Sequence, residues 1–60
     1  GLKPSDFQID YNLGVANYFS GNLKRALASF KAAFEKCTDT RSTEELKGYI
    51  AQIESELSKG

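Results

Sequence analysis

The sequence predicts an all-α fold in which an antiparallel helical hairpin packs with a third amphipathic helix. Glycine and polar clusters divide its 60 residues into three stretches, and the apolar residues of each recur every three or four positions instead of alternating. A chain of this length buries only one small core. We therefore expect a single domain over residues 1–60, with three helices connected by two short loops.

The first helix is predicted near residues 6–20. Ser5 and Gln8 have the spacing of a capping box at its start, and Gly21 suits the left-handed residue that ends a helix. Its apolar side chains fall on two sides. One side carries Ile9, Leu13, Ala16 and Ser20, and the other carries Tyr11, Val15, Tyr18 and Phe19. One neighbouring helix cannot cover both sides, so we expect the first to pack in the hairpin. The second either remains available to a partner or packs against a preceding helical unit or the third helix.

The second and third helices are predicted near residues 22–37 and 42–58. Asn22 suits the N-cap of the second, whose apolar residues form one stripe, and Ser42 with Glu45 has the spacing of a capping box for the third. The third helix has an opposite, polar side and can close a core. The predicted core comprises Leu13, Ala16, Ala26, Leu27, Phe30, Phe34, Tyr49, Ile50 and Ile53.

Composition limits the classes of partner. Eight basic residues balance eight acidic ones, so there is no excess positive charge of the kind that nucleic-acid binding requires. No apolar run approaches the ~20 residues of a membrane span, and residues 1–5 lack the apolar region of a signal peptide. A lone cysteine favours an intracellular, cytoplasmic protein. We expect neither a nucleic-acid nor a membrane partner.

Residues for catalysis are also missing from the sequence. Cys37 ends the apolar stripe of the second helix, where a small buried hydrophobe is the expected role, and the chain contains no histidine to act as its base. There is no glycine-rich phosphate loop, metal-ligand cluster or catalytic triad, and the carboxylates are scattered near helix starts and outer faces. We expect no enzyme activity, no cofactor and no metal site.

The spacing of several small and apolar residues resembles the tetratricopeptide repeat, a helix-turn-helix unit of 34 residues. The resemblance covers residues 7–39 and depends on Leu13, Gly14, Gly21, Ala26, Phe30 and Ala33. The chain departs from the family pattern at three slots, where Asp10 replaces tryptophan, Asn17 replaces tyrosine and Thr38 replaces proline. The segment 42–58 does not continue the pattern, because Lys47 occupies a core slot, and it resembles the capping helix that ends such arrays.

The resemblance implies a module for protein–protein interaction, a scaffold or adaptor that binds a partner segment on its first helix. The implied partner-binding residues are Gln8, Tyr11, Asn12, Val15, Tyr18 and Phe19. We expect Tyr11 and Tyr18 to keep much of their surface exposed, whereas Leu13 and Phe30 should not. A clamp for a terminal carboxylate is disfavoured, because no basic residue stands between Lys3 and Lys24.

Two other functions remain open. Because stability in helical arrays comes from stacking about three units or more, an isolated repeat leaves a face uncovered. The chain is then expected to be a fragment of a longer array with neighbouring repeats, or to associate with itself, and it could be a structural end-cap without an outside ligand. A small three-helix nucleic-acid binder is a third class, which the zero net charge disfavours.

Overall fold

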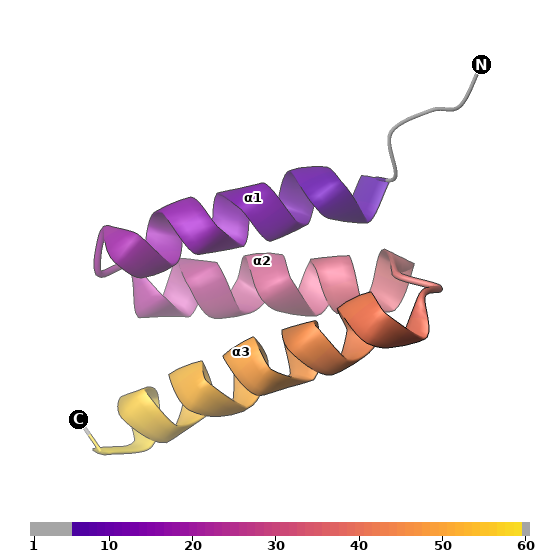
Figure 1. Cartoon of the computed structure of the whole chain (residues 1–60). Helices are drawn as coiled ribbons and strands as arrows, with labels where there is room; N and C mark the ends of the chain where they lie inside the picture. Colours follow the sequence, from indigo (N-terminus) through magenta and orange to yellow (C-terminus); the bar gives the residue numbers. More distant parts are fainter. Residues whose placement is uncertain (1–5, 60) are drawn as a thin grey trace.

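The structure is a computed structural model that describes residues 6–59, and within them it contains three α-helices and no strand. They are α1 (Asp6–Phe19), α2 (Leu23–Lys36) and α3 (Thr40–Lys59). Each helix runs antiparallel to the one before it, and α2 lies between the other two (Figure 1). The predicted hairpin with a third helix is therefore confirmed. Ser5, half of the first predicted capping box, lies outside the described residues.

The turn between α1 and α2 follows from one glycine. Gly21 has a φ of 87°, a conformation that glycine adopts without the steric cost of a Cβ. The amide of Gly21 donates to the carbonyl of Tyr18 at 3.1 Å, and that of Asn22 donates to the carbonyl of Asn17 at 2.9 Å. This pair of bonds is the Schellman arrangement that ends a helix. Asn22 is the N-cap of α2, as predicted, although its side chain makes no capping hydrogen bond.

The third helix begins two residues before the predicted Ser42. Asp39 acts as its cap, because the carboxylate accepts a hydrogen bond from the Ser42 amide at 2.9 Å and the Asp39 carbonyl accepts one from the Thr43 amide at 2.9 Å. The hydrogen bonds from Ser42 hold the pKa of the Asp39 carboxyl below its usual value. The prediction that Ser42 and Glu45 form the capping box of this helix is therefore wrong, because the N-cap is Asp39.

The core is built around α2. Its fully buried side chains come from α2 and α3, and they are Ala26, Phe30, Ala33, Leu46 and Ile53. Phe30 fills the crossing of α1 and α2: a Cβ placed on Gly14 would lie 2.9 Å from its ring, closer than real Cβ atoms approach other atoms. The small residue at position 14 therefore allows the two helices to cross closely around a large ring.

Seven of the nine predicted core residues lie in or against this core, and two do not. Ala26, Phe30 and Ile53 are buried, whereas the half-buried ones are Leu27, Phe34, Tyr49 and Ile50. Leu13 is 52% exposed and Ala16 is also exposed, so the prediction for these two is wrong. The inner side of α1 is instead its other stripe, because Gly14, which faces Phe30, is flanked on the helix by Tyr11, Val15 and Tyr18.

Polar contacts hold the three helices at their outer edges. Asp10, at the slot where the repeat family has tryptophan, accepts from the Lys36 ammonium at 2.8 Å and so joins α1 to α2. Lys31 and Glu54 form a longer, exposed pair of 3.5 Å between α2 and α3. Cys37 is half-buried beside the core, and its sulfur accepts a weak hydrogen bond from the Thr43 hydroxyl at 3.6 Å.

Candidate partner-binding groove

The inward stripe of α1 carries aromatic side chains that reach across to α3. Tyr11 meets the ring of Tyr49 on α3 edge-on, with ring centroids 5.9 Å apart and an interplanar angle of 86°. It also meets Phe30 edge-on at 5.9 Å, while Phe30 stacks on Tyr49 at 4.8 Å. Edge-to-face and offset-stacked pairs are the favourable geometries for aromatic rings. The three rings therefore tie all three helices together at one place.

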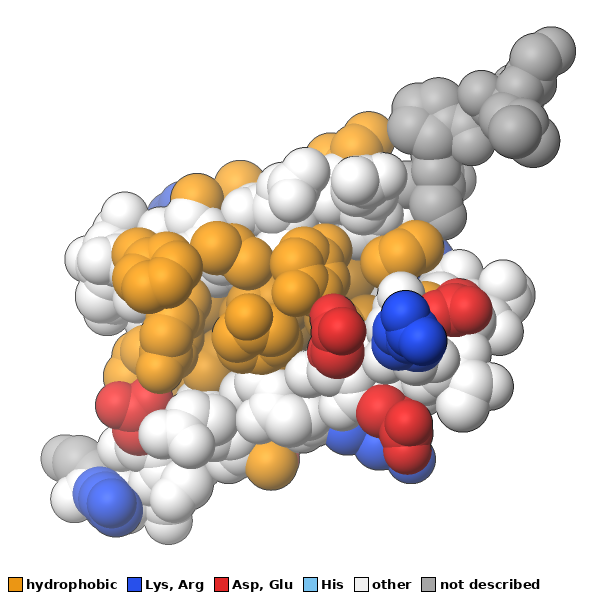
Figure 2. Space-filling model, viewed as in Figure 1, with side chains coloured by type: hydrophobic (Ala, Val, Ile, Leu, Met, Phe, Trp, Pro, Cys, Tyr) orange, Lys and Arg blue, Asp and Glu red, His pale blue; other side chains and the backbone are white. Residues whose placement is uncertain are grey.

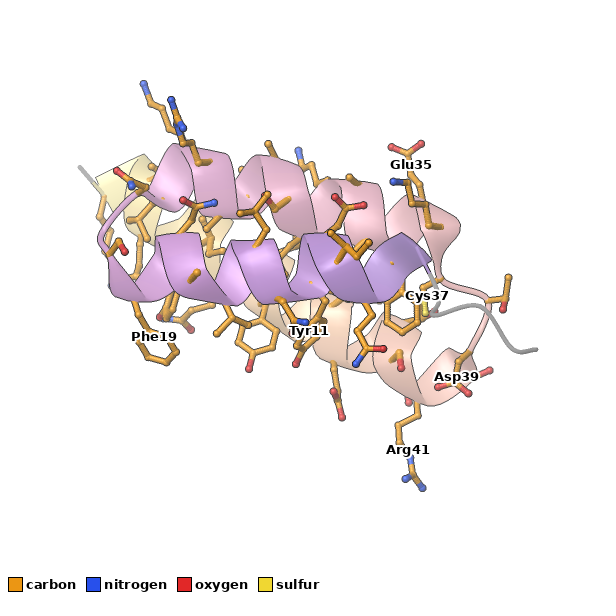
Figure 3. The ribbon with its side chains drawn as sticks, turned by 90° about the horizontal axis from the view of Figure 1, so that it is seen from above. Tyr11, Phe19, Glu35, Cys37, Asp39 and Arg41 are labelled. Carbon is orange, nitrogen blue, oxygen red and sulfur yellow. The ribbon has the colours of Figure 1, made fainter. Side chains whose placement is uncertain are left out.

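A second bridge joins α1 and α3 about two turns farther along. The Tyr18 hydroxyl donates to the Glu56 carboxylate at 3.4 Å, a long hydrogen bond. Phe19 meets the Tyr18 ring edge-on with centroids 5.7 Å apart, but it is 82% exposed. Tyr11 and Phe19 project from the same side of the molecule, opposite to Glu35 (Figure 3). An exposed aromatic therefore stands at the end of the side that Tyr11 occupies.

Between α1 and α3 this side of the molecule carries two hollows, which together we call the tyrosine groove. One is lined by Phe7, Gln8, Tyr11, Asn12, Ser42 and Glu45. The other, of about 530 Å³, is lined by Tyr18, Glu45, Gly48, Tyr49 and Gln52. Glu45 borders both hollows. Hydrophobic side chains gather between α1 and α3 on this face, with acidic side chains at both ends of the patch and a basic one among those at the right-hand end (Figure 2).

Gly48 leaves open space on the α3 side of the groove, because it has no side chain. No atom lies within 4 Å of the position that a Cβ on Gly48 would occupy, so the space beside it is open. Glycine costs a helix about 0.5–1 kcal/mol relative to alanine. Nothing packed against Gly48 accounts for that cost, in contrast to Gly14, whose missing side chain makes room for Phe30.

Electrostatics keep the Tyr11 phenol neutral. Its burial, the adjacent Tyr49 phenol and the negative charge of Glu45 raise the pKa of Tyr11 to about 12. The hydroxyl therefore remains a hydrogen-bond donor throughout the physiological pH range. The groove thus combines tyrosine hydroxyls, the amides of Gln8, Asn12 and Gln52 and one exposed carboxylate. Such groups are suited to hold a peptide backbone and its side chains.

The structure divides the six predicted site residues into three groups. Gln8, Asn12, Tyr11 and Tyr18 line the groove, Phe19 lies exposed beside it, and Val15 packs half-buried against the core without lining either hollow. Tyr11 and Tyr18 are half-buried and contact α3, so the expectation that much of their surface stays free is wrong. The stripe that was expected to be left over is also part of the core.

Sequence reasoning missed the contribution of α3 to this surface. Half of the groove comes from Ser42, Glu45, Gly48, Tyr49 and Gln52. The signal was available, because positions 45, 48, 49 and 52 recur at helical spacing on one side of α3. Only Tyr49 is large and apolar among them, so a search for apolar stripes assigned it to the core and passed over the rest.

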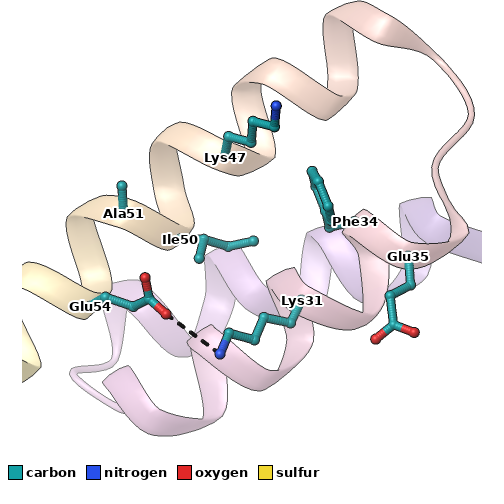
Figure 4. A pocket seen from close by; sticks show the side chains of 7 residues that line it. All are labelled: Lys31, Phe34, Glu35, Lys47, Ile50, Ala51 and Glu54. Carbon is teal, nitrogen blue, oxygen red and sulfur yellow. Dashed lines mark ion pairs between the residues drawn. The ribbon is translucent and has the colours of Figure 1, made fainter.

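A different hollow, of about 410 Å³, lies between α2 and α3 away from the groove. Phe34, Ile50 and Ala51 form its apolar part, and charged side chains surround them (Figure 4). The Lys31–Glu54 ion pair spans one edge. On the outer side of α1, Ile9 is 64% exposed and Leu13 is 52% exposed. The chain therefore has uncovered apolar surface on α1 and between α2 and α3, in addition to the tyrosine groove.

Two further features are absent from the described part of the chain. Within residues 6–59 no three histidine, cysteine, aspartate or glutamate side chains lie together in a way that could hold a metal ion. None of the helices there is both long and apolar enough to cross a membrane.

Comparisons with known proteins give the chain no relative. No protein-family model matches its sequence, and neither a curated protein nor a solved structure resembles it significantly.

Proposed function

We propose that this chain is a protein-interaction module of the tetratricopeptide type, which receives a segment of a partner protein in the tyrosine groove. The observation that carries the proposal is the placement of two adjacent hollows between α1 and α3, over half-buried tyrosines and joined at Glu45. Tyrosines with an apolar ring and a polar tip are enriched among the residues that dominate interface energies.

The helical hairpin supports the repeat-type proposal. In this interpretation, α1 is the first helix of a repeat and α3 occupies the place of the next first helix, so that both line one groove. Gly14, Ala26 and Ala33 are all buried, and Phe30 fills the space beside Gly14 where α1 and α2 cross. These four residues are among the six slots on which the sequence resemblance depends. Of the other two, Gly21 stands in the turn and Leu13 is 52% exposed. Asp10 departs from the pattern, but its ion pair with Lys36 supplies another contact between the same two helices.

The proposal is tested with a displayed library of random peptides selected against the full chain. The informative variant is Gly48→Leu, because the new side chain enters open space in the groove and displaces no neighbour. Its matched control is Ser55→Leu, at an exposed position of α3 that lines neither hollow. We expect Gly48→Leu to weaken the selected peptides by about fivefold or more, which corresponds to the loss of ~1 kcal/mol, and Ser55→Leu to leave them unaffected.

Two results would contradict this function. One is a selection that yields no peptide above background. The other is a set of peptides that Gly48→Leu and Ser55→Leu affect equally, since their binding site would then lie elsewhere. Unfolding curves of both variants ensure that a loss of binding is not a loss of folding.

A second function, self-association, is favoured by the apolar hollow between α2 and α3. A helix that ends an array is expected to present a polar outer face. Here Phe34 of α2 and Ile50 of α3 line an apolar hollow. Ile9 and Leu13 are exposed on the outer side of α1. Copies could stack with the outside of α1 on this hollow, and such a head-to-tail contact can extend to further copies.

Analytical ultracentrifugation over a wide concentration range tests this second function. We expect concentration-dependent association that Ala51→Arg, in the wall of the hollow, abolishes, while Ala28→Arg, at another exposed position, does not. A strict monomer with a high melting temperature that does not change with concentration would contradict it.

A further inference from the structure

The tyrosine groove carries negative charge without a basic side chain in its lining. Glu45 borders both hollows. At the Tyr18 end of the groove, the Glu56 carboxylate accepts a hydrogen bond from the Tyr18 hydroxyl. Among the ten residues of the described range 6–59 that line the hollows, Glu45 is the only charged one. Glu45 is exposed and makes no ion pair within the described part of the chain. Its charge is therefore available to a ligand.

The basic residues of the helices act at other places. Lys31 pairs with Glu54, on the edge of the hollow between α2 and α3, and Lys36 pairs with Asp10 outside the groove. Arg41 precedes Glu45 by one turn, but its charge lowers the pKa of Asp39 and it lines neither hollow. The described lining of the two hollows thus contains one carboxylate and no cation. A concave surface concentrates ions of the sign opposite to its charge.

The tyrosine rings add a second attraction for a cation. A ring face attracts an ammonium or guanidinium group placed within about 6 Å of its centroid, because the face of the π-system is negative. Tyr11 and Tyr49 stand almost perpendicular, so their faces are turned in different directions, and one face of Tyr49 is stacked on Phe30. The apolar body of each ring suits the methylene stem of a lysine or arginine side chain.

On the basis of the proposed function, we infer that the tyrosine groove selects partner segments that carry a lysine or arginine next to an apolar residue. The cationic head lies at Glu45, between the two hollows, and the apolar side chain lies against Tyr18 and Tyr49. This charge preference is opposite to that of a clamp for a carboxylate. It assigns Glu45, on α3, as the residue that determines specificity.

The peptides selected from the random library provide the test. Peptides whose binding is lost with Gly48→Leu define the groove-bound set, and we expect lysine and arginine to be enriched in it over aspartate and glutamate. Replacing that basic residue by methionine in a synthetic peptide keeps the apolar stem and removes the charge. We expect affinity to fall roughly two- to fivefold, the range for an exposed ion pair, with a further loss if the ring contacts contribute.

Two variants of the protein separate the role of Glu45 from a general effect of acidity. Glu45→Gln removes the charge at the groove, and Glu44→Gln removes the same charge from the neighbouring exposed position, which lines neither hollow. We expect roughly two- to fivefold weaker binding of the basic peptide for Glu45→Gln, with a smaller salt dependence, and less than about twofold for Glu44→Gln. Neither position is buried, so both variants should fold.

The outcomes distinguish this inference from the function on which it rests. Groove-bound peptides without basic residues, or an equal effect of Glu45→Gln and Glu44→Gln, would overturn the charge preference and leave the groove as a binding site. A selection without any peptide sensitive to Gly48→Leu would overturn both.

Discussion

Two glycines stand in the middle of helices in this chain, thirty-four residues apart, and their surroundings differ completely. A Cβ on Gly14 would meet the Phe30 ring at 2.9 Å, whereas one on Gly48 would meet no atom within 4 Å. The crossing of α1 and α2 is therefore closed around an aromatic ring, and the outer side of α3 beside Gly48 is open. The same residue type serves close packing at one site and leaves accessible space at the other.

The largest effect is expected from opening the closed crossing. Phe30→Ala removes a fully buried ring that contacts Tyr11 and Tyr49, and a loss of about 3–5 kcal/mol is typical of such a change. Since a single core of this size supplies about 3–5 kcal/mol in total, the variant should be unfolded in circular dichroism at 25 °C. Phe19→Ala is the control, because Phe19 is 82% exposed. Equal melting of the two variants would refute the described crossing.

Overfilling the crossing should cost less than emptying it. Ala26 is fully buried on α2, so Ala26→Leu has to displace its neighbours, at about 1–3 kcal/mol. Ala28→Leu adds the same atoms to an exposed position of the same helix and should change stability little. Urea unfolding of both variants measures the difference. An Ala26→Leu protein as stable as the parent would show that the two helices do not cross closely there.

Substitution of the two glycines tests the comparison directly. Alanine gains about 1 kcal/mol over glycine within a helix, and Gly48→Ala should realise this gain because its Cβ enters free space. In Gly14→Ala the clash with Phe30 should exceed the gain and leave a net loss of about 1 kcal/mol. Thermal and urea unfolding of the pair should thus shift in opposite directions. Shifts of the same sign would mean that both sites are equally open or equally packed.

The smallest effect is expected at the start of α3. The Ser42 amide lowers the pKa of Asp39 in the folded state, so the carboxylate stabilises the protein above its unfolded pKa, near 3.8, and this contribution is lost as the pH falls through the lower folded value. Asp39→Asn keeps a capping oxygen without the titration. We expect the difference in stability between parent and variant to decrease below pH 4. A difference that stays constant between pH 2 and pH 6 would argue against this cap.

The sequence allowed the second helix to be predicted well and the first only in part. The apolar residues of α2 follow one stripe, so Ala26 and Phe30 could be assigned to the core. The first helix has apolar residues on two sides, and periodicity alone does not decide which side faces inward. Leu13 was placed inside and is exposed. Small residues did not decide it either, because Gly14 and Ala16 lie on different sides of the helix and only Gly14 stands at the close crossing.

The candidate groove was predictable on one wall only. Gln8, Tyr11, Asn12 and Tyr18 were identified from α1, but the opposite wall depends on how α3 docks on α2. That docking is a matter of tertiary packing, and polar residues such as Glu45 and Gln52 leave no apolar pattern to reveal it. The start of α3 was also ambiguous, because Asp39 and Ser42 are both good N-cap residues.

The central position of α2 has a consequence for motion. The backbones of α1 and α3 each contact α2 but not one another, and only side chains such as Tyr11 with Tyr49 and Tyr18 with Glu56 connect them. Detachment of α3 would therefore leave the hairpin intact, a partial opening that amide hydrogen exchange can detect separately from global unfolding. A ligand held between α1 and α3 would oppose that opening. Slower amide hydrogen exchange along α3 would then report that the groove is occupied, even if the exchange of the α1 amides did not change.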